Sequence, residues 1–255
     1  MSVESRGGVE EGESCKTIKG RLEEVNTPLV GLMPKDVEEP FELVSKIKER
    51  RPNGELMNLD RMLIHSPSFA AGWNHLLGNV RREMSALADQ RLLELAILVV
   101  GIQNGAIYEV IHHTKPFLEA SSCKDPQETL EEITYLTKHF QYDETKEELI
   151  GTNLFNAEER LVIQIAIGIT KFEPTLVSET IEKLKRWKAF KQEEVGEEAS
   201  ASSAVVELVG AVSAYNMVSR FLVFTEGILP EKGSASEMID ETISDWWNAQ
   251  QGRTS

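Results

Sequence analysis

The strongest constraint on the fold is an apolar run that carries a single carboxylate. Leu92–Val100 is apolar on every side of a helix except at Glu94. A helix that is hydrophobic all round is buried, and an ionised carboxylate inside a protein is unfavourable without a partner. The run is too short to cross a bilayer, so it predicts a core helix rather than a membrane span. Glu94 therefore needs a partner from another part of the chain.

The nearest dense run of hydrogen-bonding side chains is Tyr108–His113. Glu109 and His113 are four residues apart, which puts them on one face of a helix. Histidine titrates near neutral pH and can exchange a proton with a carboxyl group beside it. The pattern predicts an acid/base site in which Glu94 and His113 lie within hydrogen-bonding distance. The predicted catalytic residues are Glu94, His113 and Tyr108, and the predicted substrate-binding residues are Glu109, His112 and Trp73.

Each of these residues also has a purely structural interpretation. Glu94 could bond a backbone group or an arginine such as Arg91 or Arg220. His113 could be a satisfied core histidine, and Tyr108 could serve packing alone. Glu109 lies in the first turn of its helix, where a carboxylate favours the helix dipole without any chemistry.

Composition narrows the classes of ligand. The chain has 255 residues and a formal net charge of -15. A surface that binds nucleic acid needs clustered Lys and Arg, so we expect no nucleic-acid partner. The one basic run, Lys46–Arg51, is interrupted by Glu49 and is typical of a solvated helix end. No glycine-rich phosphate loop, HExxH motif or Cys/His cluster occurs, so we expect no cofactor and no metal.

The cysteines and the start of the chain predict a location in the cell. Cys15 and Cys123 form no CxxC pattern and are interpreted as free thiols in a reducing compartment. The first twelve residues have no apolar core of the kind found in signal peptides. We therefore expect a cytoplasmic protein with a small-molecule substrate and no membrane partner.

The predicted fold class is all-α, because apolar positions recur at helical spacing and no segment alternates like a strand. Residues 1–25 are expected to be a disordered tail, 26–230 the folded domain, and 231–255 a C-terminal amphipathic helix and tail. Lys191–Ser200 is the expected flexible link. The expected helices are 39–51, 66–83, 88–103, 106–120, 125–139, 157–171, 174–190, 201–226 and 236–248.

Two stretches also suggest an internal duplication. Ala88–Glu94 and Ala157–Ile163 share an acidic first turn, an arginine and an apolar helix. Tyr108 and His113 are echoed by Tyr215 and Arg220 at similar spacing. If the repeat is real, only the first copy holds both the carboxylate and the histidine.

Over about residues 55–230 the chain resembles the carboxymuconolactone decarboxylase superfamily, whose redox branch is the AhpD-like alkylhydroperoxidases. The resemblance rests on His65-Ser66-Pro67 with Trp73, the Arg91–Leu95 helix, Tyr108-Glu109 with His113, and Glu207 with Tyr215–Phe221. It implies a compact all-α domain that assembles as a homotrimer or homohexamer. The candidate interface anchors for such an assembly are Trp246 and Trp247.

The redox branch combines a Cys-x-x-Cys pair with a glutamate and a histidine. Glu94 and His113 match the last two, but the cysteine positions fall on Ala106 and Glu109, so no peroxide-reducing dithiol is expected here. The resemblance then implies a cofactor-free decarboxylase, isomerase or dehydratase that acts on an oxygenated organic acid, lactone or polyketide-like enol. The alternative is a non-catalytic oligomeric scaffold or small-molecule binding protein.

Overall fold

A computed structural model describes most of the chain between residues 30 and 231. The described residues are 30–51, 53–82, 89–121, 126–138, 142–143, 148–149, 153–195, 201–225, 228 and 230–231. The predicted tail 1–25, the predicted helix 236–248 with Trp246 and Trp247, and both cysteines lie outside these residues.

The described residues form nine helices and one two-stranded antiparallel ribbon, so the all-α prediction is confirmed. The helices are α2 (Phe41–Arg50), α3 (Asn58–Leu63), α4 (Pro67–Arg82), α5 (Gln90–Asn104), α6 (Ile107–Ala120), α7 (Pro126–Lys138), α8 (Ala157–Lys171), α9 (Pro174–Val195) and α10 (Ala201–Phe224). The strands are β1 (Tyr142–Asp143) and β2 (Glu148–Leu149), which the sequence did not predict.

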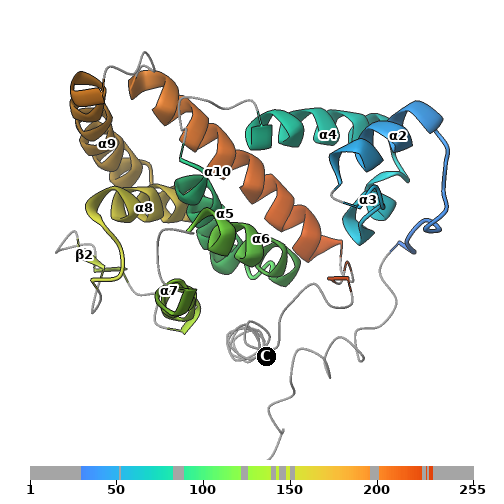
Figure 1. The fold of residues 1–255 in the computed structure, drawn as a ribbon, viewed down its shortest axis with the longest axis horizontal. Helices are drawn as coiled ribbons and strands as arrows, with labels where there is room; N and C mark the ends of the chain where they lie inside the picture. The colour runs from blue at the N-terminus through green and yellow to red at the C-terminus, as the bar shows by residue number, and fades with distance from the viewer. Residues whose placement is uncertain are drawn as a thin grey trace, which may run out of the picture.

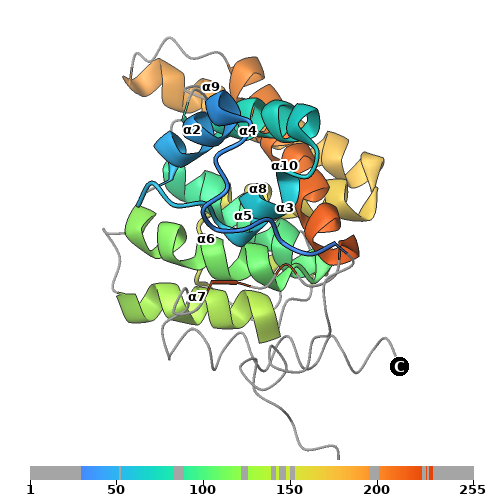
Figure 2. The same ribbon diagram turned by 90° about the vertical axis from the view of Figure 1, so that its right-hand side faces the viewer.

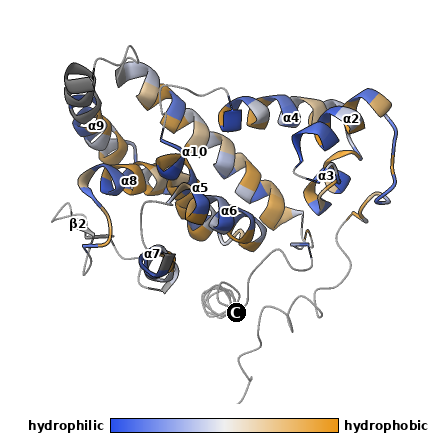
Figure 3. Cartoon of the chain, viewed as in Figure 1, coloured by the Kyte–Doolittle hydropathy of each residue, from blue (hydrophilic) through white to orange (hydrophobic). Residues whose placement is uncertain are grey.

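Helix α5 is the centre of the fold. It packs against α6, α7, α8 and α10, and every residue from Arg91 to Ile102 is buried. Figure 1 shows α10 running diagonally across the molecule beside α5 and α8. Much of the hydrophobic colour in Figure 3 gathers on α5 and the helices around it. The apolar run therefore forms the buried helix that its composition predicts.

Local sequence explains the two ends of α5. The Asp89 side chain accepts hydrogen bonds from the backbone N–H groups of Arg91 and Leu92, which caps the first turn. At the other end Gly105 adopts a left-handed conformation with φ 71°, which glycine reaches without steric cost. The break predicted at Asn104-Gly105 is confirmed, and α6 begins two residues later.

Two expectations about helices need correction. Helix α9 continues to Val195, so the first half of the expected link Lys191–Ser200 is helical, and residues 196–200 lie outside the described part. Helix α3 was not predicted at all. It has only six residues, too few for an apolar period to stand out.

The hairpins α5–α6 and α8–α9 correspond closely. The same number of residues separates Gln90 from Ala157, Asn104 from Lys171 and Ile107 from Pro174. This register pairs Glu94 with Leu161, whereas the sequence comparison above aligned it with Ile163. It also leaves Tyr215 on α10, outside both hairpins. The duplication stays a hypothesis, and the helix bounds favour a register that differs by two residues.

One described helix has the length and composition of a membrane span. It is Ser202–Phe224, and 56% of its most apolar window is buried inside the molecule. Since α10 packs against α4, α5, α6, α8 and α9, we interpret it as a core helix.

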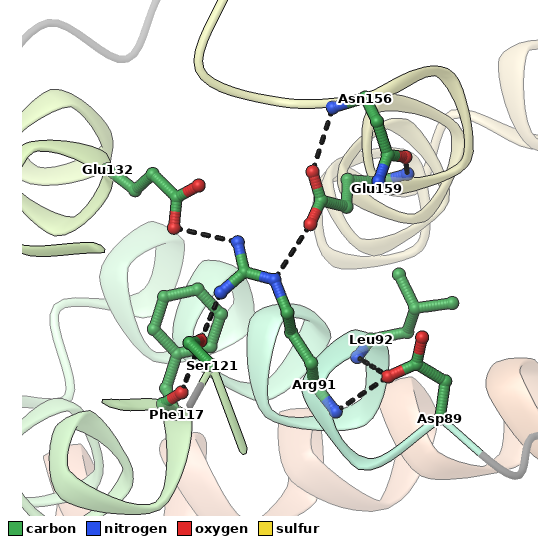
Figure 4. A network of polar contacts seen from close by, with 8 residues as sticks. All are labelled: Asp89, Arg91, Leu92, Phe117, Ser121, Glu132, Asn156 and Glu159. Carbon is green, nitrogen blue, oxygen red and sulfur yellow. Dashed lines mark hydrogen bonds and ion pairs between the residues drawn. The ribbon is translucent and has the colours of Figure 1, made fainter. Parts of the chain in front are cut away.

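A buried arginine connects α5 to α6, α7 and α8 (Figure 4). Nε of Arg91 donates to Glu159 on α8 at 2.8 Å, and Nη2 donates to Glu132 on α7 at 2.7 Å. Nη1 donates to Ser121 at the end of α6, and the guanidinium lies 4.5 Å from the centre of the Phe117 ring. Each of the three guanidinium nitrogens therefore has a partner, and Arg91 has a structural role.

We expect Arg91→Met to lower the free energy of unfolding by about 3–5 kcal/mol, because it leaves two buried carboxylates without their cation. Urea unfolding followed by circular dichroism measures this change. Arg160→Met, which removes a partly buried arginine in the first turn of α8, is the matched control. A loss below about 1 kcal/mol for Arg91→Met would contradict the structural role.

Candidate active site

The predicted contact between Glu94 and His113 is present. Nδ1 of His113 lies 2.7 Å from Oε2 of Glu94, across the turn that joins α5 to α6. The Glu94 side chain is fully buried, whereas that of His113 is 14% exposed. The histidine is therefore the member of the pair that solvent can reach.

The other carboxylate oxygen of Glu94 is held by two residues that the sequence did not single out. Nη1 of Arg81, in the last turn of α4, lies 2.7 Å from Oε1 of Glu94, and Nε2 of Gln90 donates to the same oxygen at 2.9 Å. Neither Arg91 nor Arg220 is the partner, since Arg91 binds Glu132 and Glu159 and Arg220 is exposed.

Sequence signals for these two partners differ in strength. Gln90 lies four residues before Glu94 on the same helix, so i, i+4 spacing could have identified it. Arg81 lies thirteen residues before Glu94 on a different helix. Basic residues are common in the last turn of a helix because they interact favourably with the helix dipole. The position of Arg81 therefore did not identify it as a partner of Glu94.

The partners determine the charge state of the pair. Burial opposes ionisation of Glu94, but the hydrogen bond and charge of His113, the charge of Arg81 and the bond from Gln90 outweigh it and lower the pKa of Glu94. Burial lowers the pKa of His113, assisted by the charge of Arg81 and only partly opposed by Glu94. The pair at neutral pH is therefore an ionised carboxylate beside a neutral imidazole.

This charge state determines which ring nitrogen of His113 carries the hydrogen. Because Nδ1 faces an ionised carboxylate at 2.7 Å, Nδ1 carries the hydrogen and donates it to Glu94. Arg81 Nη1 lies 3.1 Å from Nδ1, and both nitrogens donate to the same carboxylate. The other ring nitrogen, Nε2, then holds a free lone pair, which is the form of histidine that accepts a proton.

Tyr215 of α10 completes the surroundings of the pair. Its ring meets that of His113 edge-on, with 5.0 Å between centroids and 89° between planes. Burial raises the pKa of Tyr215 to about 12, although the charge of Arg81 partly offsets this. The hydroxyl therefore stays protonated at neutral pH and can donate a hydrogen bond. Helices α4, α5, α6 and α10 thus converge on one group of side chains.

Tyr108 and His112, the predicted neighbours of the pair, contact Glu231 instead. The Tyr108 hydroxyl donates to Oε1 of Glu231 at 3.2 Å, and His112 Nε2 lies 2.7 Å from Oε2. Burial opposes ionisation of Glu231, but His112 and the Asn58 N–H outweigh it and lower its pKa to about 2. These contacts bind Glu231 to α3 and α6.

Glu109 and Trp73 also lie apart from the pair. The Ser219 hydroxyl of α10 lies 2.9 Å from both carboxyl oxygens of Glu109, and burial raises the pKa of Glu109 well above its usual value. Trp73 packs between the rings of Phe69 and Phe221 at 5.7 and 5.2 Å. Within the described residues, Tyr108, Glu109, His112 and Trp73 form no hydrogen bond or ion pair with Glu94 or His113.

The described part of the chain contains no group of three or more His, Cys, Asp or Glu side chains that could hold a metal ion. The polar groups around Glu94 instead comprise one carboxylate, its three donors and a tyrosine hydroxyl. That set is suited to moving protons and stabilising negative charge.

In comparisons with known proteins, no protein-family model, no curated protein and no solved structure matches this chain. The resemblance to the carboxymuconolactone decarboxylase superfamily therefore stays a prediction from the residues that carry it. Function has to be argued from the geometry of the site.

We expect Glu94→Gln to lower the pKa of His113 further, because the amide removes the negative charge that favours the imidazolium. Titration of ring signals by NMR, with ¹⁵N-labelled histidine, measures the shift. The signals of His75, an exposed residue on α4, provide the internal control. An unchanged or raised His113 pKa would contradict the pairing.

Glu109 should make stability depend on pH in a defined direction. In the unfolded chain Glu109 ionises near pH 4.5, but in the folded protein it stays protonated to much higher pH. The folded state then binds the extra proton, so the contribution of Glu109 to stability falls as pH rises above about 4.5, by up to ~1.4 kcal/mol per pH unit. Glu109→Gln should lack this decline.

Urea unfolding of both proteins between pH 4.5 and 8 measures the difference. Glu119→Gln, which changes an exposed glutamate on the same helix, is the matched control. A constant difference between wild type and Glu109→Gln across this range would show that Glu109 ionises in the folded state.

Proposed function

We propose that this chain is a cofactor-free acid/base enzyme, a lyase or isomerase, in which His113 transfers the proton. The observation that carries the proposal is the arrangement of Arg81, Glu94 and His113. Glu94 is held ionised and bonded to Nδ1, which leaves Nε2 as the base on the less buried member of the pair. A carboxylate that orients a histidine in this way is a recurring feature of proton-transfer sites.

The first step is removal of a proton from a carbon next to a carbonyl group. The C–H bond breaks, the proton goes to Nε2 of His113, and the electron pair moves through the new C=C bond onto the carbonyl oxygen. Glu94 stabilises the imidazolium through the bond to Nδ1. Return of the proton from Nε2 to another carbon gives isomerisation. In dehydration Nε2 gives the proton to a β-hydroxyl group, which leaves as water while the enolate electrons form the new C=C bond. Decarboxylation starts instead with the proton already on Nε2, and the enolate formed by loss of carbon dioxide takes it up.

The enolate oxygen needs donors, and the structure supports a different pair from the one expected. The sequence analysis counted Tyr108 among the catalytic residues and Glu109 among the substrate-binding residues, but these two contact Glu231 and Ser219. Tyr215 and Arg81 lie beside His113 and carry a protonated hydroxyl and a guanidinium. We assign the stabilisation of the enolate to these two residues.

An exchange assay tests the proposal without knowledge of the natural substrate. Keto acids, unsaturated lactones and 1,3-diketones are incubated with the protein in D₂O, and loss of the C–H signal is followed by ¹H NMR. We expect exchange with at least one class, reduced by roughly 10²–10⁴-fold in His113→Ala, the usual contribution of a positioned base. His75→Ala, a surface histidine on α4, is the matched control.

Two outcomes would count against the enzyme. Exchange that is equal in wild type and His113→Ala would remove the histidine from the mechanism. No exchange with any class would favour the scaffold or small-molecule binding protein that the sequence left as the alternative.

We also propose that the chain self-associates through a patch of apolar side chains on α4 and α10, with a homotrimer or homohexamer as the expected form. The patch consists of Phe69 and Leu76 on α4 and Met217, Phe221 and Phe224 on α10, and Phe69 contacts Phe221 across the two helices. Phe224 is 76% exposed, which is unusual for so large a hydrophobic side chain.

We expect Phe224→Glu to shift the protein toward the monomer, because a carboxylate cannot be buried in an apolar interface without large cost. Light scattering on wild type and variant at micromolar concentration measures the mass. Phe172→Glu, which changes an exposed phenylalanine at the α8–α9 turn, is the matched control. A monomeric wild type would contradict the proposal.

A further inference from the structure

Helices α6 and α10 meet at two contacts that lie one turn apart on both helices. At the first, the ring of His113 on α6 meets the ring of Tyr215 on α10 edge-on, with 5.0 Å between centroids. At the second, the hydroxyl of Ser219 on α10 lies 2.9 Å from each carboxyl oxygen of Glu109 on α6. Glu109 precedes His113 by four residues, and Ser219 follows the tyrosine at the same spacing. Because residues four apart share a face of a helix, the two contacts are neighbours in one interface.

The contact between Glu109 and Ser219 is enclosed by protein. Glu109 is 2% exposed and Ser219 is fully buried. Helix α5 approaches it closely at Gly101, where an added Cβ would lie 3.3 Å from Oε1 of Glu109. Helices α5, α6 and α10 contact one another in pairs and lie side by side in both Figure 1 and Figure 2. The same three helices carry the carboxylate, the histidine and the tyrosine of the candidate active site.

A carboxyl group is an unfavourable choice for so buried a position. Burial raises the pKa of Glu109 well above its usual value, so the group stays protonated where an exposed glutamate ionises. A leucine side chain would avoid this loss of hydration. What a hydrogen bond adds over an apolar contact is a defined distance and register between two helices, because satisfied buried polar contacts make a core rigid and specific. The contact with Ser219 is therefore suited to positioning one helix against the other.

We propose that Glu109 is a positioning residue for the candidate active site. Its contact with Ser219 holds α6 and α10 in the register that keeps the Tyr215 ring against His113. The held ring restricts rotation of the imidazole, whose Nδ1 bonds Glu94, and keeps the tyrosine hydroxyl beside it as a donor to the enolate. The restriction of the imidazole depends on these contacts alone, whereas the effect on the enolate rests on the function proposed above.

NMR of the His113 ring tests the proposal without a substrate. Protein with ¹³C- and ¹⁵N-labelled histidine is compared at pH 7, and the His113 signals are assigned by their absence in His113→Ala. The ring current of Tyr215 shifts these signals, so Tyr215→Leu gives their position without the contact. We expect Ser219→Ala to move the His113 signals from the wild-type position toward that of Tyr215→Leu. Ser213→Ala, which changes an exposed serine on the same helix, is the matched control and should leave them in place.

Two substitutions of Glu109 separate positioning from stability. Glutamine keeps the size, a donor and an acceptor, so Glu109→Gln should leave the His113 signals at their wild-type position. Leucine cannot bond Ser219, so Glu109→Leu should shift the signals as Ser219→Ala does. Because leucine also removes a buried carboxyl group, its thermal unfolding midpoint should equal or exceed that of wild type. A displaced ring in a protein of undiminished stability is what a purely structural role would not produce.

Two results would overturn the proposal. One is a lowered unfolding midpoint in Glu109→Leu with unchanged His113 signals, which would make the contact structural. The other is an unchanged His113 signal in Ser219→Ala, which gives the answer independently if Glu109→Leu does not fold.

The exchange assay in D₂O measures the consequence for proton transfer. We expect Ser219→Ala and Glu109→Leu to lower kcat for exchange by up to roughly 10²-fold, the cost of a misplacement of about 1 Å, with KM nearly unchanged. Glu109→Gln should keep the wild-type kcat. Equal kcat in all variants despite shifted His113 signals would overturn the effect on catalysis. No exchange in wild type would contradict the proposed function alone, because the NMR measurement tests the positioning without turnover.

Discussion

The organisation of this protein depends on a helix buried on every side that carries both an arginine and a glutamate. Arg91 and Glu94 lie within one turn of α5, yet they do not pair with each other. Each of the two side chains instead pairs with side chains of other helices, because a buried charge is tolerated only with partners of good geometry. Arg91 binds α7 and α8, and Glu94 binds α4 and α6. Two buried charges thus specify how four helices surround α5.

The charged groups of this protein are of two kinds. Arg91 has a partner for every arm of its guanidinium and is enclosed by protein, which is how a structural arginine is satisfied. Around Glu94, His113 keeps some exposure, and the described residues show no hydrogen bond to its Nε2.

Sequence reasoning succeeded where the signal is local or arises from burial. The cap at Gly105, the start of α4 at Pro67 and the bounds of α8 follow from helix propensity and terminal residues. The contact between Glu94 and His113 followed from a different argument, that a carboxylate in an apolar helix must find a partner. Reasoning from composition failed at Lys191–Val195, where a glutamate-rich stretch continues α9 instead of linking two helices.

The sequence by itself determined that the chain is helical, that α5 is its core, and that Glu94 requires a donor. Apolar periodicity and the cost of a buried charge depend only on residue type and spacing. Tertiary structure alone decided that Arg81 and Tyr215 surround the pair and that Tyr108 and His112 contact Glu231. These contacts join helices far apart in the chain, and which surface side chains meet there depends on how the helices pack around α5. No local pattern carries that information.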